Sequence, residues 1–470
     1  METLEMVRDG EKQTRRDAFD FVREIHQGQS RAGVYAAAGL VLIGAAIMLP
    51  HGCFLQPGTV WKFWAGAAVA TLGFGLSLRE NFSARTTVSL FWIVAIGARL
   101  ILLGMEPGDD IWRYLWDGKV RLHGINPYLS SPADSNLAPL REAWWAKMNH
   151  RDLSASYPPA AETAFAAFAA MSCTGIFFKL AFVGADLAIV WLLWRKFRQA
   201  AILYAWNPLV LYVFAGGGHF DSLFVLPMVG AWVLLEAPAG AGASRERPWL
   251  SAALLLGLSV AVKWMSLPLC AWLVWRCWKE RGRARAWAVA ILAVAPLLLT
   301  WFLIFPGTKF HELAPTQAML YARSSEFFPW VVGLISKKSL YTNQPFMLLL
   351  VPLTVWVIGA ERRFDRAAET YFFGLLILSP AIHAWYFVWL LPWAVRSRNW
   401  GAILGSASFF VYFWLQQRQA LSLEWTQTPL QKLLLWSPII AGFFCSRWRE
   451  TRSNEDSNPS PFFERSGSAS

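Results

Sequence analysis

The sequence predicts an all-α protein that crosses a membrane many times. Of its 470 residues, 56% are hydrophobic and only 16% are charged, and the mean hydropathy is +0.35. Apolar runs such as 32–50, 86–104 and 286–306 have the length of about 20 residues that a helix needs to cross a ~30 Å hydrocarbon core. Many of the 28 tryptophans lie near the ends of such runs, where a membrane meets water. This composition excludes fibrous, collagenous and mostly disordered chains.

About fourteen membrane segments are expected, and four of them form two bent hairpins. Residues 249–275 and 368–395 are each too long for one span and too short for two full spans, so each is expected to turn, at Lys263 and at His383 respectively. The expected segments are 32–50, 60–78, 86–104, 174–194, 199–215, 219–236, 249–262, 264–275, 286–306, 344–360, 368–382, 384–395, 399–416 and 430–446.

The charge distribution predicts the orientation. Most of the 43 lysines and arginines fall on one side of the expected segments, together with both termini, and that side is therefore assigned to the cytoplasm. The formal charge of +12 is explained in this way and by attraction to anionic lipids, so no nucleic-acid partner is expected.

The protein is expected in the cell inner membrane. The expected parts are a cytoplasmic tail at 1–31, two extra N-terminal spans at 32–85, a membrane module at 86–395, C-terminal spans at 396–446 and a disordered cytoplasmic tail at 447–470.

The first outer loop, residues 105–158, is too long for a simple connection and too rich in Trp, Tyr, Leu and Pro to be disordered. It is expected to fold as short amphipathic helices on the membrane surface. The stretch that follows, from Tyr157 to Met171, is expected to be a helix at the outer interface.

Two adjacent carboxylates, Asp109 and Asp110, begin this loop. A nearby cation can keep one of them ionised while repulsion raises the pKa of the other, which is the arrangement that a general base near neutral pH requires. The alternative is that Asp110 caps a surface helix that begins at Ile111. The dipeptide alone leaves both interpretations open.

Charged residues at membrane depth supply the next candidates. Lys263 lies in a strongly apolar hairpin, where a phosphate partner would relieve the cost of its charge; the alternative is that it snorkels toward the headgroups. Arg113 is a second candidate for a phosphate, because guanidinium binds phosphate in a bidentate manner. Lys62, Arg99 and Lys179 are expected to snorkel from the ends of their spans.

A glycine-rich turn precedes a polar pair at Gly216–Asp221. It would permit close approach of a sugar or phosphate to His219 and Asp221, although Asp221 could simply cap the helix that follows. His383 and Tyr386 lie at the corresponding turn of the second hairpin. Histidine at a membrane interface also tolerates both water and lipid, so whether these histidines take part in chemistry stays open.

These motifs together resemble a known family. Asp109-Asp110-x-x-Arg113-Tyr114-x-Trp116-Asp117-Gly118, Gly-Ile-Asn-Pro-Tyr at 124–128 and Tyr-Pro-Pro at 157–159 are followed by Asn-Pro-Leu-Val at 207–210, Gly-His-Phe-Asp at 218–221 and Ser-Pro-Ala-Ile-His-Ala-Trp-Tyr at 379–386. In this order they resemble bacterial mannosyltransferases of the GT-C fold that use a polyprenyl-phosphate sugar.

The resemblance implies an inverting transfer of a hexose, such as mannose, from a polyprenyl-phosphate donor to a hydroxyl of a glycan, lipid or protein at the periplasmic face. It implies a general base at Asp109-Asp110, with Asp110 favoured because it adjoins the Ile-x-Arg-Tyr run. The donor and its phosphate would be held by Lys263, Arg113, Tyr114, His219, Asp221, His383 and Tyr386. No cofactor is evident, and a divalent metal stays open. The competing hypotheses are a secondary transporter and an O-antigen polymerase or ligase.

Overall fold

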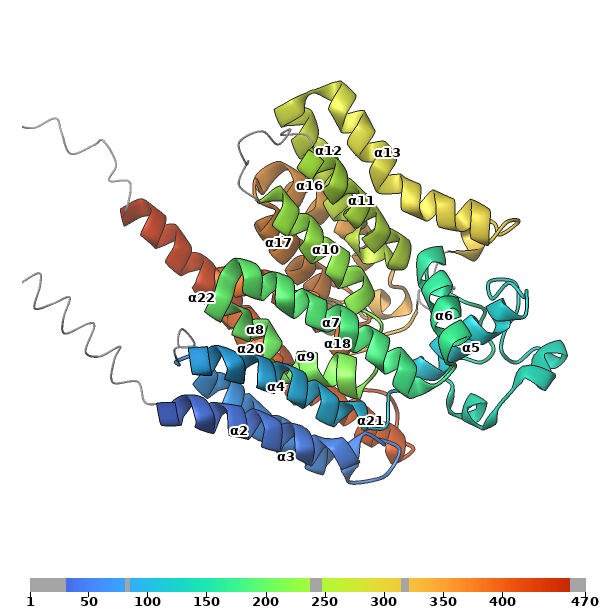
Figure 1. Cartoon of the computed structure of the whole chain (residues 1–470), viewed down its shortest axis with the longest axis horizontal. Helices are drawn as coiled ribbons and strands as arrows, with labels where there is room; N and C mark the ends of the chain where they lie inside the picture. Colours follow the sequence, from blue (N-terminus) through green and yellow to red (C-terminus); the bar gives the residue numbers. More distant parts are fainter. Residues whose placement is uncertain (1–30, 81–84, 237–246, 314–320, 457–470) are drawn as a thin grey trace, which may run out of the picture.

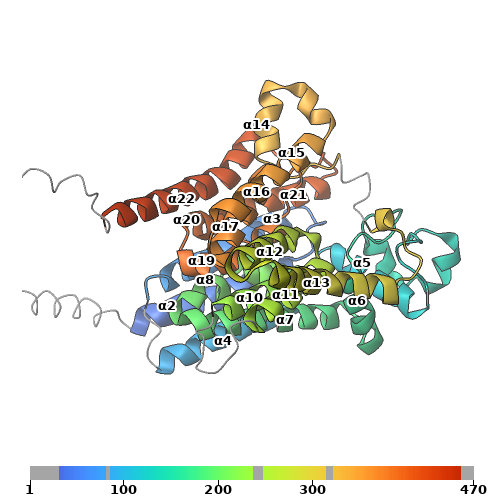
Figure 2. The ribbon, with the colours of Figure 1, turned by 90° about the horizontal axis from the view of Figure 1, so that it is seen from above.

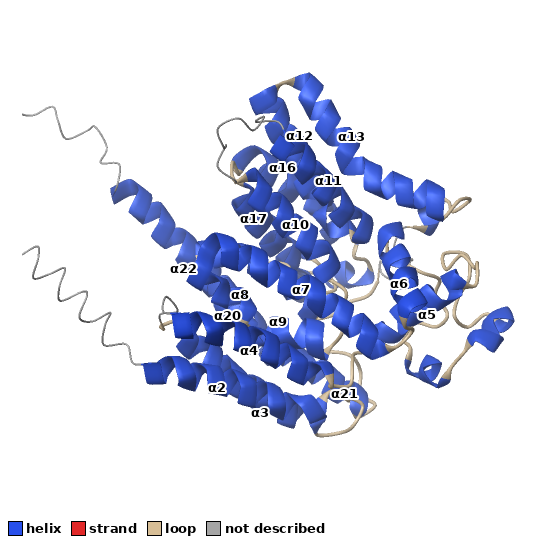
Figure 3. Ribbon diagram, in the orientation of Figure 1, coloured by secondary structure: helices blue, strands red, loops and turns tan. Residues whose placement is uncertain are grey.

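The computed structural model describes residues 31–80, 85–236, 247–313 and 321–456. Within these ranges the chain consists of helices and connecting loops and has no strand, which confirms the all-α prediction (Figure 3). Three helical segments of the described chain, Ala32–His51, Gly175–Ala205 and Arg283–Ile304, are long and apolar enough to cross a membrane, and four shorter apolar helices accompany them. The membrane class agrees with these helices, and the count of fourteen spans stays a prediction.

The N-terminal helices form one side of the bundle. Helices α2 (Arg31–Met48), α3 (Thr59–Ser77) and α4 (Arg85–Leu103) lie side by side, and α4 also packs against α7 (Gly175–Phe197) (Figure 1). Their bounds agree with the first four predicted spans to within a few residues at most ends. Helices α2 and α3 therefore form a hairpin that is packed against the rest of the protein, and their role as two extra spans stays a prediction.

The segment predicted as one span at 199–215 is not a continuous helix, because it is broken into short pieces. It consists of α8 (Ile202–Ala205), α9 (Pro208–Leu211) and the π-helix η5 (Tyr212–Gly216). Pro208 starts α9, and the side chain of Asn207 caps it by accepting from the N–H groups of the next two helical residues. Every residue from 201 to 222 is buried, so the apolar run reflects a central core segment.

The remaining helices complete the bundle. The turn predicted at Lys263 is confirmed, because α11 ends at Val262 and a short 3-10 helix begins at Trp264. The second hairpin turns between Leu378 and Ala384, as expected. The helices are α10 (Ser222–Leu235), α11 (Arg247–Val262), α12 (Leu267–Arg281), α13 (Arg283–Leu299), α14 (Phe328–Ile335), α15 (Gln344–Leu348), α16 (Leu350–Ala360), α17 (Phe364–Leu378), α18 (Ala384–Phe387), α19 (Leu391–Ser397), α20 (Trp400–Ser408), α21 (Trp414–Ala420) and α22 (Pro429–Asp456).

The molecule has two opposite ends. In Figures 1 and 2, α2 begins and α22 ends at one end, here called the terminal end, while α5 (Asp110–Leu122) and α6 (Pro159–Met171) lie at the other, here called the loop end. The long loop folds as α5 and two 3-10 helices, Ser135–Leu140 and Ala143–Lys147, as the sequence predicts. The carboxylate pair therefore lies far from both ends of the described chain.

Two charged side chains that were expected to snorkel are buried inside the bundle. Arg99 is fully buried and its Nε lies 2.5 Å from Oδ2 of Asp186, which is also fully buried. Lys179 is 1% exposed, and its ammonium donates hydrogen bonds to carbonyls at the end of α4. The snorkelling prediction is therefore wrong for Arg99 and Lys179, because a carboxylate in one case and free helix-end carbonyls in the other satisfy the cation locally. Lys62 is exposed, as expected.

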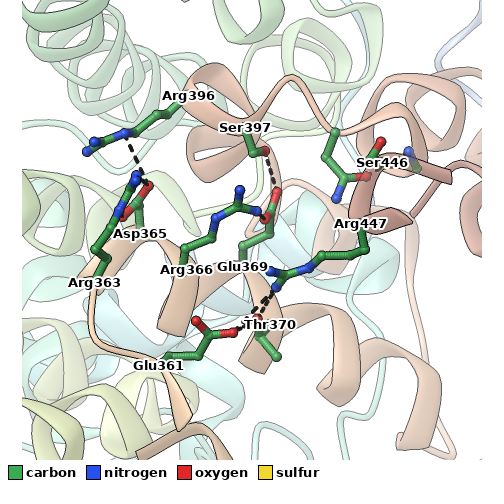
Figure 4. A network of polar contacts seen from close by, with 12 residues as sticks. Glu361, Arg363, Asp365, Arg366, Glu369, Thr370, Arg396, Ser397, Ser446 and Arg447 are labelled. Atoms are coloured by element: carbon green, nitrogen blue, oxygen red, sulfur yellow. Dashed lines mark hydrogen bonds and ion pairs between the residues drawn. The ribbon is translucent and has the colours of Figure 1, made fainter. Parts of the chain in front are cut away.

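A network of ion pairs ties the ends of α17, α19 and α22 together (Figure 4). Arg363 and Arg396 both face Asp365, at 2.5 and 3.6 Å, and Arg447 lies 3.5 Å from Glu361.

Helix α22 continues to Asp456, so the segment 447–456 is helical, whereas the sequence predicted a disordered tail there. The predicted tails 1–31 and 447–470 otherwise lie almost entirely outside the described residues.

Candidate active site

Asp109 and Asp110 lie at the start of α5, at the loop end. Asp109 occupies the N-cap position, but its side chain makes no capping hydrogen bond. Asp110 is the first helical residue; its Oδ1 accepts a hydrogen bond from Nδ2 of Asn149 at 2.8 Å, and its Oδ2 lies 3.5 Å from Nδ1 of His219. The interpretation of Asp110 as a cap is therefore not supported, because its carboxylate faces Asn149 and His219.

The surroundings give the two carboxyls different proton affinities. Asp109 is accessible to solvent, but the protein atoms around it weaken its hydration, and this effect together with the negative charge of Asp110 raises its pKa to about 6. Burial would also raise the pKa of Asp110, but the contact with His219 and the hydrogen bond from Asn149 outweigh burial and lower this pKa to about 2. One carboxylate thus stays ionised while the other titrates near neutral pH.

The backbone that leads to the pair is held on two sides. We call residues 104–108, between α4 and Asp109, the strap. The ammonium of Lys179 donates to carbonyls at the end of α4 and to that of Met105 in the strap, the latter at 2.8 Å. The N–H of Gly108 donates to the carbonyl of Gly217 at 2.9 Å. The position of the carboxylates is therefore tied to α7 and to the glycine-rich turn.

The turn at Gly216–Gly218 requires glycine at its last position. Gly218 has φ +73°, and a Cβ there would lie 2.9 Å from Cδ1 of Ile111. We expect Gly218→Ala to lower the unfolding free energy by about 1–2 kcal/mol, because an L side chain is strained in the left-handed region. Thermal unfolding measures this, with Gly75→Ala as the control, because a Cβ at Gly75 meets no atom within 4 Å. An unchanged melting temperature of Gly218→Ala would contradict the expectation.

His219 and His383 both stack on the ring of Trp385. The ring of Trp385 lies 3.9 Å from the ring of His219 and 4.5 Å from the ring of His383, nearly parallel to both. Nδ1 of His383 is 2.8 Å from the hydroxyl of Tyr412, so its ring is held in place. Tyr386 lies edge-on to His383. The two predicted histidines are thus brought together through Trp385.

Lys263 and Asp221 form a second charged pair beside this group. The ammonium of Lys263 donates to Oδ1 of Asp221 at 2.6 Å, and Nε1 of Trp389 donates to the same oxygen at 2.7 Å. The rings of Phe220, Tyr386 and Trp389 lie 4.7 to 5.3 Å from the ammonium, within cation–π distance. Lys263 therefore does not snorkel, and Asp221 makes no side-chain capping bond although it occupies the N-cap position of α10.

Arg113 and Tyr114 occupy a buried cluster beside this region. Nε of Arg113 donates to both oxygens of Asp117 at 3.0 and 2.9 Å, so an intrahelical carboxylate neutralises the guanidinium. Tyr114 is 1% exposed and packs on Phe165 and Phe220. Tyr114 thus contacts Phe220, whose ring also faces the ammonium of Lys263, while Arg113 is paired with Asp117. A phosphate-binding role for either residue stays a prediction.

Four contacting residues were not predicted as site residues. Trp385 and Trp389 lie in or beside the motif that contains His383, so their order along the chain could have suggested them. Asn149 and Tyr412 lie 39 and 29 residues from their partners Asp110 and His383. In the sequence, Asn149 lies in a loop without a motif and Tyr412 lies in an apolar segment without a motif. Only the tertiary fold identifies them as residues of the site.

The site is therefore one continuous group of contacts. It runs from Asp110, next to Asp109, through His219, Trp385 and Tyr386 to Lys263, with the carboxylate pair at one end and an ammonium at the other. Such an arrangement can accept a proton at one point and stabilise negative charge at another. Across the described ranges, no three His, Cys, Asp or Glu side chains are grouped so that they could hold a metal ion.

Comparison with known proteins gives one structural match. No protein-family model matches the chain, and no curated protein matches it significantly. Among solved structures, the chain is similar to the crystal structure of ArnT from Cupriavidus metallidurans bound to undecaprenyl phosphate. The match covers 80% of this chain and 79% of that chain, with 14% sequence identity and a TM-score of 0.43.

Proposed function

We propose that the protein is an inverting glycosyltransferase of the inner membrane that moves a hexose, with mannose as the first candidate, from a polyprenyl-phosphate donor to an acceptor hydroxyl. The observation that carries the proposal is the continuous group of contacts between the Asp109-Asp110 pair and Lys263. In this proposal the loop end faces the periplasm and both termini are cytoplasmic. The order of motifs along the chain supports the same assignment.

The reaction needs a proton acceptor at the attacking hydroxyl. We assign this role to Asp109, because its carboxylate is accessible and its pKa of about 6 suits proton transfer near neutral pH. Asp110, which the sequence favoured as the base, would instead hold His219 and Asn149 in place and keep the pKa of Asp109 raised. The acceptor oxygen attacks the anomeric carbon, its proton passes to Asp109, and the bond from that carbon to the phosphate oxygen breaks.

The leaving polyprenyl phosphate carries negative charge away from the sugar. Lys263 is the cation placed to stabilise it, and the pair with Asp221 and the aromatic rings keeps its ammonium in position before the donor arrives. Oδ2 of Asp221 is buried and has no hydrogen-bond partner among the described residues. The Trp385 ring and its two histidines would form the wall against which the sugar lies.

The test is transfer from radiolabelled polyprenyl-phosphate mannose to extracted membrane glycolipids by the purified protein, with polyprenyl-phosphate glucose and galactose as parallel donors. We expect transfer from at least one donor by the wild type and by Lys62→Met, which removes an exposed lysine outside the site. Inactivity with every donor and with glycan, lipid and peptide acceptors would overturn the proposal. Activity with another hexose would replace mannose and leave the class unchanged.

A further inference from the structure

The hairpin of α2 and α3 contacts the site at its turn, residues 52–58. Gly52 is buried and has an ordinary φ of −79°. A Cβ at this position would lie 2.4 Å from the carbonyl oxygen of Glu106 and 2.6 Å from Cγ of Met105. The hairpin turn therefore lies directly against the strap that leads to Asp109, and glycine is needed there because of the close approach of the two backbones.

The same turn also contacts aromatic residues next to Tyr412, on the side of the site that holds His383. Phe54 is 8% exposed, and its ring lies 5.2 Å from the ring of Phe413 and 6.4 Å from the ring of Tyr212. Phe63 in α3 lies within 5.0 Å of both of these rings. Phe413 follows Tyr412, whose hydroxyl contacts His383. The hairpin thus supports the element that holds His383.

The third contact is with the element that carries the glycine-rich turn. Tyr212 begins the π-helix η5, and its carbonyl accepts a hydrogen bond from Gly217 at 2.6 Å. Gly217 in turn accepts from Gly108 in the strap. Polar bonds join the hairpin to the element that contains Tyr412 and to α21, because Nε1 of Trp64 donates to the carbonyl of Phe410 at 2.8 Å and the N–H of Gly58 donates to Gln417 at 3.1 Å.

From these contacts we propose that the α2–α3 hairpin is a positioning element of the active site. Its turn presses on the strap through Gly52 and on Tyr212 and Phe413 through Phe54, so it sets where Asp109 and His383 lie relative to each other. The hairpin contributes no reacting group. This inference rests on the proposed function for its kinetic test and has a second test that does not depend on activity.

The kinetic test compares Gly52→Ala with Gly39→Ala, the same change within α2 at a position where a Cβ meets no atom within 4 Å. Displacing a reacting group by about 1 Å can cost roughly 100-fold in rate, so we expect kcat of Gly52→Ala to fall by roughly 10- to 100-fold. The KM for the polyprenyl-phosphate donor should change less than kcat, because the residues around Lys263 are not moved directly. Gly39→Ala should behave as the wild type.

Phe54→Leu is the milder second variant, in case Gly52→Ala does not fold. Its matched control is Phe91→Leu, which changes a buried ring that packs on Trp92 and Trp194. We expect the kcat of Phe54→Leu to fall while that of Phe91→Leu is maintained. If Gly52→Ala and Phe54→Leu both keep the kcat of the wild type, the inference is wrong.

The second test follows the histidine rings directly. In full-length protein labelled with ¹³C at the histidine Cε1, the resonances of His219 and His383 are assigned by substituting each with Gln. We expect Gly52→Ala to shift the His219 signal and Phe54→Leu to shift that of His383, with neither moving in the control variants. Unmoved signals would overturn the inference. Moved signals in a protein that transfers no sugar would overturn the proposed function but retain the positioning role.

Discussion

Replacing Asp109 with Asn is expected to lower the transfer rate by roughly 100- to 10,000-fold, which is the usual contribution of a general base. The substitution keeps the size of the side chain and removes its ability to accept a proton. The measurement is kcat for transfer from the donor identified with the wild-type protein, together with thermal unfolding to show that the variant is folded. An Asp109→Asn protein with nearly full activity would return the role of base to Asp110.

The pH dependence distinguishes the two carboxylates. A base must be unprotonated to act, so with the pKa of Asp109 at about 6, kcat/KM should be constant above pH 7 and fall about tenfold per pH unit below pH 6. Removing the negative charge next to Asp109 lowers its pKa, so the Asp110→Asn variant should keep its activity to lower pH. If Asp110 were the base, its pKa of about 2 would leave the rate flat between pH 5 and 8.

His219 is the control for this profile. It faces Asp110 at 3.5 Å and is not the proposed base, so replacing it with Gln tests whether the profile depends on the carboxylates alone. In His219→Gln, the fall in kcat/KM below pH 6 should persist, because the pKa of about 6 belongs to Asp109. A profile that becomes flat in this variant would contradict Asp109 as the base. The donor phosphodiester does not interfere, because it has no ionisation in this range.

The sequence predicts the long apolar helices of this protein better than the segments that are buried inside the bundle. Hydropathy and length locate α2, α3, α4 and α7, because a helix that faces lipid must be apolar over its whole length. The same criterion fails for residues 199–215, since a segment buried among other helices has the same composition as one buried in lipid. Asn207 and Pro208, which break this segment, belong to a recognisable motif, but hydropathy does not mark them as a helix boundary.

The sequence locates buried cations but does not identify their partners. The apolar surroundings of Lys263 were sufficient to single it out, because an ion at membrane depth needs a partner. That partner could not be chosen from the sequence, and the structure shows it to be Asp221. Arg99 and Lys179 have similar surroundings along the chain, but their partners are a carboxylate and helix-end carbonyls, so they support the fold and the strap. A lysine in an apolar segment therefore indicates that a buried partner is present. Only the structure shows whether this partner is a carboxylate or a set of backbone carbonyls.

Replacing Lys263 with Met is expected to reduce transfer by roughly 100- to 1,000-fold, because the charge on the leaving phosphate then loses its cation. The variant should also unfold at a lower temperature. Asp221 is 1% exposed, and removing one partner of a buried ion pair costs about 3–5 kcal/mol, since the other charge is left uncompensated. A measured loss of activity in this variant alone could therefore reflect instability.

The double variant Lys263→Met, Asp221→Asn separates the two effects. It removes both charges, and the amide can still accept the hydrogen bond from Trp389, so most of the lost stability should return. Transfer should stay low, because no cation is restored. Lys263→Arg keeps the charge and should retain more activity than either. If the double variant regains both melting temperature and transfer, Lys263 is a structural partner of Asp221 and the phosphate must be stabilised by another group.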